Sequence, residues 1–186
     1  CKTSVALTVT GEKLKVNYVT TSTARVEGIS TIEQMDSLPK EQVSHVTAYF
    51  DGFVRPLQQI QWEGSPEGKD VIAIHAYDAV GREKKKYLPF VSTRSDGKYR
   101  YINPSDPSAL NAFYQAADDL IANTHYPFAE TVIESSPLNR VIEQGAAGEE
   151  WQLGTGHTTR FRYSAYKETD TQSDVLIWKE NAQGEI

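Results

Sequence analysis

One short phrase occurs twice in this 186-residue chain and constrains its fold more than any other feature. Residues 49–55 read YFDGFVR and residues 77–82 read YDAVGR, and each phrase lies between segments in which apolar and polar residues alternate. Repeats of about 20 to 50 residues are typical of proteins built from stacked supersecondary units. The residues of this repeat motif are Tyr49, Asp51, Gly52, Arg55, Tyr77, Asp78, Gly81 and Arg82. The pattern predicts stacked β-hairpins and favours a structural role over a compact enzyme.

The residue types in the two phrases suit a turn between two strands. An Asp at the turn entry can accept a hydrogen bond from the N–H two residues on, and Gly81 can adopt positive φ without steric cost. The Tyr would pack on the neighbouring hairpin, and the Arg would pair with the Asp or stack on an aromatic ring. A ligand site built from the same residues is the alternative. Val54 stands where the second phrase has Gly81, and a β-branched residue resists positive φ, so we expect the first turn to differ in geometry, for example by a bulge.

The remaining patterns predict a mainly β fold, with β-hairpin repeats in a twisted antiparallel sheet and one substantial α-helix near residues 106–123. Strand-like residues 131–133 and 140–142 flank a turn-like segment and predict a third, degenerate hairpin. For the helix, Asp106 can cap and Pro107 suits the first turn. Apolar residues then recur at helical spacing: Ala109, Leu110, Phe113, Ala116, Ala117, Leu120 and Ile121.

The N-terminal part reads differently from the rest. Residues 5–9 and 14–18 alternate around a turn-like tetrad at 10–13, which indicates a hairpin. Residues 21–43 are rich in Ser and Thr without a clean period, and we predict a linker with little regular structure. The domain division expected is therefore 1–42, a hairpin and linker, and 43–186. The strand-like residues 175–178, followed by a turn signal, suggest a longer parent chain.

Composition excludes several classes of function. A net charge of −6 and a pI of about 5.3 do not attract phosphate backbones, so no nucleic-acid partner is expected. No apolar run is long enough for a transmembrane segment, and the single Cys cannot form an internal disulfide. The four His residues lack zinc-motif spacing, and we predict no metal and no cofactor. Cys1 stands where an initiator Met is expected. It would carry lipid if the chain were a processed bacterial lipoprotein, the alternative being an arbitrary boundary of the sequence.

Candidate binding and catalytic residues are few. Trp151 beside Glu150 suggests a loop that stacks a sugar ring, with Trp62 as a further aromatic candidate, although a Trp that anchors a loop by packing is the alternative. Ser164 and Lys167 fit a Ser-x-x-Lys pattern, as do Ser37 and Lys40. Neither pair has the companion motifs of a Ser-x-x-Lys enzyme. Because no nucleophile, base and oxyanion donor can be assembled, we predict no enzymatic activity and no catalytic residue.

The repeated phrases resemble the Tyr-Asp repeats of Rhs-type proteins. Further blocks follow in order along the chain: YLPF at 87–90, YPF at 126–128, ESSPLNRV at 134–141, GEEW at 148–151 and GHT at 156–158. Together they resemble the uncharacterised N-terminal domain that precedes the repeat array in large bacterial Rhs-family surface proteins. The resemblance covers about residues 43–186.

The resemblance implies an exported protein, extracellular or on the cell surface, whose β-ribbons spiral into a hollow shell, often around a C-terminal effector. It implies a non-enzymatic structural domain that starts, caps or plugs the shell or mediates surface attachment. The partners implied are the remainder of a longer Rhs-type chain or its effector, and an outer-membrane or secretion partner. The alternative is a carbohydrate- or surface-binding module that uses exposed aromatic residues.

Overall fold

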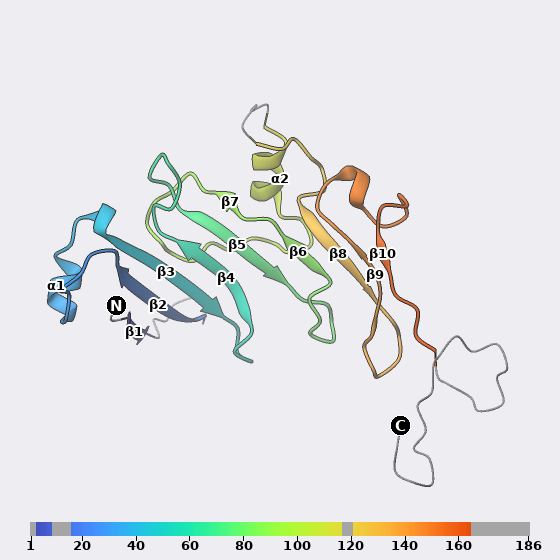
Figure 1. Cartoon of the computed structure of the whole chain (residues 1–186), viewed down its shortest axis with the longest axis horizontal. Helices are drawn as coiled ribbons and strands as arrows, with labels where there is room; N and C mark the ends of the chain where they lie inside the picture. Colours follow the sequence, from blue (N-terminus) through green and yellow to red (C-terminus); the bar gives the residue numbers. More distant parts are fainter. Residues whose placement is uncertain (1–2, 9–15, 117–120, 165–186) are drawn as a thin grey trace, which may run out of the picture.

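The computed structural model describes residues 3–8, 16–116 and 121–164, and they form one antiparallel sheet (Figure 1). Nine strands follow one path in the order β1-β2-β3-β4-β5-β6-β8-β9-β10, and β7 lies off this path beside β5. The strands are β1 Thr3–Thr8, β2 Asn17–Ala24, β3 Val43–Phe50, β4 Pro56–Gln61, β5 Val71–Ala76, β6 Lys85–Tyr87, β7 Phe90–Val91, β8 Phe128–Ile133, β9 Val141–Gly145 and β10 Thr159–Arg160. The predicted fold class, mainly β with antiparallel hairpins, is confirmed.

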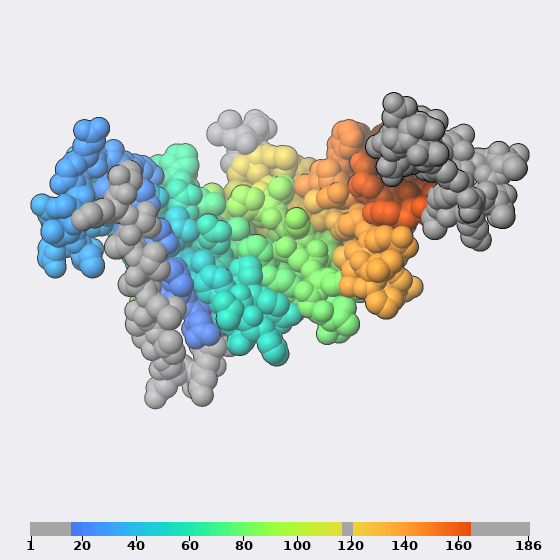
Figure 2. Space-filling model, turned by 60° about the horizontal axis from the view of Figure 1, so that its bottom comes forward, coloured from blue at the N-terminus to red at the C-terminus, as the bar shows by residue number. Residues whose placement is uncertain are grey.

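Strand order in the sheet follows the order of the chain. In the space-filling view, the described residues run from blue to red along the long axis of the molecule (Figure 2). Strand β5 is where this simple meander branches. One edge of β5 pairs with β4, whereas the other edge pairs with β7 at Val71 and Ile72 and with β6 at His75 and Ala76. The segment between β6 and β8 therefore leaves the sheet path and returns to it.

That segment carries helix α2, Ser108–Tyr114, which is shorter than the predicted helix over 106–123. Asp106 does not cap it, because the N-cap is Pro107, which makes no side-chain cap bond. At the other end, the Thr124 amide donates to the Tyr114 carbonyl at 3.0 Å and takes up an acceptor that a continuing helix would use. Of the predicted apolar stripe, Ala117 and Leu120 lie outside the described residues.

The main hydrophobic core lies between the sheet and the β7–α2 segment. Its buried members are Tyr49, Ile60, Ile72, Ile74, Phe90, Leu110 and Tyr114. Ile60, Ile72 and Leu110 are fully buried, and each contributes about 1.5–3 kcal/mol relative to an exposed side chain. The Tyr114 hydroxyl donates to the Pro89 carbonyl at 2.6 Å. Helix α2 is thus held by apolar packing and by a partly buried hydrogen bond.

A buried ion pair fastens the loop after β7 to the sheet. The guanidinium Nη2 of Arg100 lies 2.7 Å from Oδ2 of Asp70, whose side chain is fully buried. The same carboxylate accepts the amides of Glu63 at 3.0 Å and Gly97 at 2.9 Å. Gln58, also buried, bonds both the amide and the carbonyl of Arg100. This polar part of the core links residues distant in the chain, and no sequence pattern indicated it.

The predicted linker over residues 21–43 is wrong. Strand β2 extends to Ala24 and pairs with β3 along its whole length, and α1 Ile32–Asp36 and the 3-10 turn η1 Lys40–Gln42 follow. Thr31 and Gln34 form a reciprocal capping box that starts α1. A second small core of Ala24, Met35 and Val43 joins α1 to β2 and β3. The Ser and Thr residues here suit an extended strand and a helix cap rather than a loop.

Two predicted hairpins are present. β1 and β2 pair from Thr3 with Thr23 to Thr8 with Tyr18, and β8 pairs with β9. The predicted turn at 10–13 and the predicted strand at 175–178 lie outside the described residues.

Candidate functional site

Three hairpin turns lie on the same side of the sheet, where the strands end, which is the lower side in Figure 1. Turn 1 (residues 51–55) joins β3 to β4, turn 2 (78–82) joins β5 to β6, and turn 3 (134–140) joins β8 to β9. Turns 1 and 2 contain the repeated sequence phrase. They are the strongest candidate for the functional feature of the chain, because the same arrangement of side chains recurs in them.

Turns 1 and 2 have nearly the same hydrogen bonds. The amide of Asp51 donates to the Arg55 carbonyl at 3.0 Å, and that of Asp78 donates to the Arg82 carbonyl at 2.9 Å. Oδ1 of each Asp accepts the amides two and four residues on, at 2.8 and 2.9 Å in turn 1 and at 3.0 and 2.9 Å in turn 2. Oδ2 of each Asp accepts Nε of the Arg, at 2.7 and 2.9 Å. Each Asp therefore closes its turn through backbone and side chain together.

The expectation that Val54 would change the geometry of turn 1 is wrong. Val54 has φ of 62° and Gly81 has φ of 82°, so both lie in the left-handed region. The bonds around Asp51 fix the backbone on both sides of Val54 and hold it in a conformation that a β-branched residue disfavours. An irregularity does occur nearby, because the β3–β4 register shifts between Tyr49 and Phe50, before the turn.

Turn 3 repeats the arrangement with different residues. The amide of Glu134 donates to the Arg140 carbonyl at 2.9 Å, and the two carboxylate oxygens accept Nε and Nη2 of Arg140, both at 2.9 Å. Asn139, directly before the Arg, has φ of 51°. The loop is longer than in turns 1 and 2, and the longer Glu side chain spans it. Sequence reasoning missed Glu134 and Arg140, although an Asn before an Arg was an available signal for positive φ.

In each turn, the Arg side chain contacts a residue further along the chain. The guanidinium carbon of Arg55 lies 4.8 Å from the ring centroid of Tyr77. Nη1 of Arg82 donates to Oδ1 of Asn139 at 3.1 Å, and the guanidinium carbon of Arg140 lies 4.7 Å from the ring centroid of Tyr163. We call these contacts the arginine row. They join turn 1 to turn 2, turn 2 to turn 3, and turn 3 to the chain after β10.

The two Tyr residues of the repeat motif do not occupy equivalent places. Tyr77 directly precedes Asp78, and its hydroxyl donates to the Pro56 carbonyl of the preceding hairpin at 2.9 Å. The residue directly before Asp51 is Phe50, whereas Tyr49 is buried in the core and donates to the Gly97 carbonyl at 2.9 Å. Tyr49 also packs against the rings of Tyr18 and Tyr99. The Tyr residue is therefore two positions before the Asp in the first phrase and one position before it in the second.

The turns hold their carboxylates ionised. Hydrogen bonds from the Arg82 amide, and then from the Arg82 side chain, keep the pKa of Asp78 well below its usual range. The Arg140 side chain and the Ser136 hydroxyl lower the pKa of Glu134 to about 2. At Asp51 desolvation raises the pKa, but the bonds from Arg55 and Phe53 outweigh it and the net shift is downward. All three groups are therefore carboxylates at neutral pH, each paired with a guanidinium.

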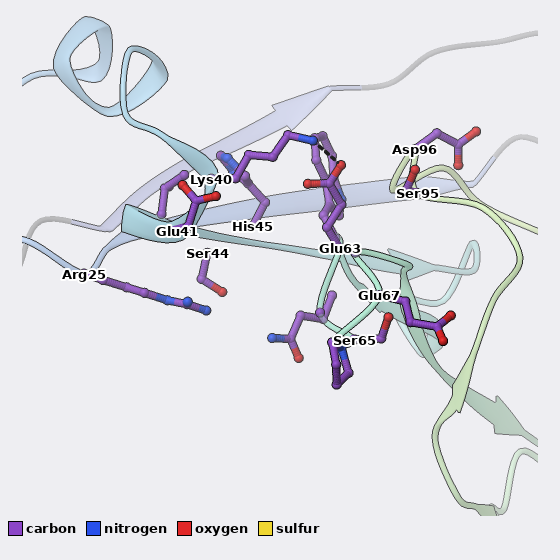
Figure 3. A pocket seen from close by; sticks show the side chains of 16 residues that line it. Arg25, Lys40, Glu41, Ser44, His45, Glu63, Ser65, Glu67, Ser95 and Asp96 are labelled. Carbon is purple, nitrogen blue, oxygen red and sulfur yellow. Dashed lines mark hydrogen bonds and ion pairs between the residues drawn. The ribbon is translucent and has the colours of Figure 1, made fainter. Parts of the chain in front are cut away.

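A pocket with a volume of about 1060 Å³ lies near the start of β3 and the end of β4, at the ends of these strands away from turn 1 (Figure 3). Trp62, 37% exposed, is its aromatic member. The Trp62 indole Nε1 donates to Oγ1 of Thr47 at 2.9 Å, and its ring lies 5.2 Å from the His45 ring. Charged side chains of both signs surround it, among them Lys40, which pairs with Glu63. The lining therefore places hydrogen-bond donors and acceptors around one indole ring.

The structure does not bring the three candidate binding residues together. Trp151 and Glu150 lie in the 3-10 turn η2 Glu149–Trp151, between β9 and β10, and not in the pocket with Trp62. Trp151 is 50% exposed and packs against the ring of His157 at 5.6 Å. The neighbouring Gln152 is buried and donates to the carbonyls of Phe128, Ala146 and Gly148. The Gln152 side chain therefore fastens this loop through hydrogen bonds, whereas the Trp151 side chain packs against His157.

The residues of the two Ser-x-x-Lys patterns do not form a site in the described part of the chain. The hydroxyl of Ser37 donates to the Gln34 carbonyl at 2.9 Å, and Lys40 pairs with Glu63, so each has another partner. Cys1 and Lys167 lie outside the described residues. Within residues 3–8, 16–116 and 121–164, no group of three or more His, Cys, Asp or Glu could hold a metal ion. In the same part of the chain, no helix has the length and apolar character needed to cross a bilayer.

Comparison with known proteins gives one result. The searches of curated proteins and of solved structures found no match. A family model with the description "Domain of unknown function (DUF6443)" matches residues 21–165, which include all three turns, the pocket residues and helix α2. The match spans well over half of the chain. The chain therefore belongs to the family of domains of unknown function DUF6443.

Proposed function

We propose that this chain is a non-enzymatic structural domain that begins a row of stacked β-hairpins in an exported Rhs-type protein. The observation that carries the proposal is the arginine row, in which Arg55 and Arg82 each contact a residue of the next hairpin and Arg140 contacts Tyr163, which follows β10. A contact that recurs from unit to unit is what a repeat array needs, because each unit is stabilised mainly by its neighbours.

The N-terminal side of the sheet has a feature that supports a starting position. At the N-terminal side, α1 and Met35 cover the ends of β2 and β3. Shielding of this kind is expected of a terminal unit, which has no further repeat to bury its apolar residues. At the other side, β10 pairs with β9 alone among the described strands, as β1 pairs with β2 alone. A following hairpin would add at the free edge of β10.

The contact between Arg140 and Tyr163 supports the same direction of growth. Arg140 reaches past β10 to a residue that follows it in the chain. In turn 2 the equivalent ring, Tyr77, directly precedes the acid that closes the turn. Tyr163 would in the same way introduce the next unit of the row.

The test uses the full-length protein that contains this chain. Arg140→Ala should expose the segment after residue 164 to protease, whereas Arg160→Ala, which removes an exposed guanidinium paired with Glu143, should leave the cleavage pattern unchanged. Cryo-electron microscopy of the same protein should show the sheet continuing past β10. A separate domain after residue 164, with cleavage unchanged in both variants, would refute the proposal.

A second candidate function is a carbohydrate- or surface-binding module, which the pocket around Trp62 favours. An aromatic ring can stack on a sugar while carboxylates and amides accept and donate to its hydroxyls. A glycan array with the wild type, Trp62→Ala and Trp151→Ala decides the matter. Loss of binding in Trp62→Ala alone would place the site in the pocket, and loss in Trp151→Ala alone would place it at η2. Absence of binding by the wild type would exclude both sites.

A further inference from the structure

The three turns share a feature that their hydrogen bonds do not require. In each turn, the residue directly before the left-handed position is large and apolar: Phe53 before Val54, Val80 before Gly81, and Leu138 before Asn139. These three side chains are 83%, 72% and 69% exposed, and Val54 adds a fourth at 73%. We call these four side chains the apolar tips. The Phe53 ring has the Arg55 guanidinium 5.4 Å from its centroid, but Phe53, Val80 and Leu138 all remain mostly exposed, so burial within the chain does not explain an apolar residue at this place.

The apolar tips belong to one edge of the molecule. The turns that carry them project separately along the lower side of the space-filling view, in the teal, green and orange parts of the chain (Figure 2). Neighbouring turns are two strands apart, which corresponds to about 10 Å. The tips therefore form a spaced row rather than one contiguous patch.

The turns carry no uncompensated negative charge, although the chain as a whole has a net charge of −6. Asp51 pairs with Arg55, Asp78 with Arg82, and Glu134 with Arg140. Within residues 51–55, 78–82 and 134–140, each carboxylate thus has a guanidinium from its own turn. An apolar surface could approach this edge without meeting an unpaired carboxylate in the turns.

The spacing of the apolar tips favours a lipid bilayer over a protein partner as the surface that contacts them. A stable protein partner usually buries about 800 Å² on each side in a closely fitted patch, and four side chains on three separate turns do not offer such a patch. A lipid bilayer needs no fitted shape, because each apolar side chain enters the acyl boundary independently. We propose that this edge of the sheet docks onto a lipid bilayer, with Phe53, Val54, Val80 and Leu138 inserted below the headgroups. This proposal is independent of the proposed role in a hairpin array.

Vesicle flotation with neutral phosphatidylcholine liposomes tests the proposal. The wild-type chain should float with the vesicles at both low and high salt, because apolar insertion is not screened. The triple variant Phe53→Ser/Val80→Ser/Leu138→Ser should show a partition coefficient at least about tenfold lower. The matched control is Ile32→Ser/Tyr101→Ser, which removes two exposed apolar residues that are not among the apolar tips. It should bind the vesicles like the wild type. Circular dichroism of each variant establishes that the fold is retained.

A second measurement does not depend on the triple variant. A polarity-sensitive fluorophore attached at Leu138→Cys, in a Cys1→Ser background, should shift to shorter wavelength with vesicles, and the same label at Ile32→Cys should not. Failure of the wild type to float, or equal loss in the control, would overturn the proposal. Binding only to anionic vesicles and only at low salt would overturn it as well. A wild-type dimer that the triple variant converts to a monomer would assign the tips to a second copy of the chain instead.

Discussion

Val54 and Gly81 occupy the same place in two turns and share the left-handed backbone conformation, although one is β-branched and the other has no side chain. The Asp at the start of each turn accepts the amides that flank this place, so the backbone path is set before the side chain is considered. Holding a valine there costs about 1 kcal/mol or more. Replacing Val54 by Gly and replacing Gly81 by Val should therefore change the free energy of unfolding in opposite directions.

Val54→Gly should raise the free energy of unfolding by about 1 kcal/mol, because it relieves the strained backbone. Gly81→Val should lower it by at least about 1 kcal/mol. A Cβ at residue 81 would also lie 2.8 Å from Nη1 of Arg55, which would have to move. Urea denaturation of both variants measures the two shifts. Shifts of the same sign would contradict the equivalence of the turns.

Arg55 and Tyr77 should be energetically coupled. A double-mutant cycle with Arg55→Ala and Tyr77→Leu should give a coupling free energy of about 0.5–2 kcal/mol, the range of a cation–π contact that is partly shielded from water. The control cycle combines Arg55→Ala with Tyr101→Leu. Tyr101 is exposed and lies outside the arginine row, so the coupling free energy should be near zero. Equal coupling in the two cycles would show that the Arg55–Tyr77 contact does not stabilise the stack.

Acid should destabilise the fold in part through Glu134. Its pKa is about 2 in the folded chain, because of Arg140 and Ser136, and about 4.3 when unfolded. The unfolded chain therefore binds more protons between these values, and the stability that Glu134 contributes is present above about pH 4 and lost as the pH falls toward 2. Urea midpoints measured from pH 6 to pH 2 should fall less steeply for Glu134→Gln than for the wild type. Parallel curves would contradict the assignment.

The buried carboxylate of Asp70 should be a sensitive position. Asp70→Ala removes the partner of Arg100 and leaves a guanidinium largely buried, which should cost about 3–5 kcal/mol. The matched control is Asp96→Ala, which removes the other carboxylate that Arg100 contacts, at 3.0 Å, but which lies at a more exposed site. Its effect on the denaturation midpoint should be clearly smaller. If the two variants unfold at the same midpoint, the pair does not fasten the loop.

Helix α2 offers a neighbouring pair for a test of the core. Leu110 is fully buried and Ala109 is exposed. Leu110→Ala should lower the free energy of unfolding by about 2–5 kcal/mol, whereas Ala109→Ser should change it little. Thermal or chemical denaturation of the two variants checks this. A normal midpoint for Leu110→Ala would remove α2 from the main core.

Sequence alone could predict the hairpins, because alternation of apolar and polar residues is local information. It could not reveal turn 3 as a copy of turns 1 and 2, since Glu134 replaces Asp and the loop is longer, so that only the shared bonds expose the likeness. Helix α1 was missed because its apolar stripe is too short to read, although the capping residues Thr31 and Gln34 were visible. The bond network around Asp70 and the pocket around Trp62 join segments distant in the chain, and such pairings leave no periodic trace.

The chain-order path of the sheet has a consequence for how the molecule folds. Apart from the insertion that carries β7 and α2, each strand pairs with the strand that precedes it, so most of the loops closed during folding are short. Short loop closures make assembly fast and allow it to spread from a nucleus to adjacent units. A protein that lengthens in this manner can acquire its shape progressively from its first hairpin, without waiting for its last residues to appear.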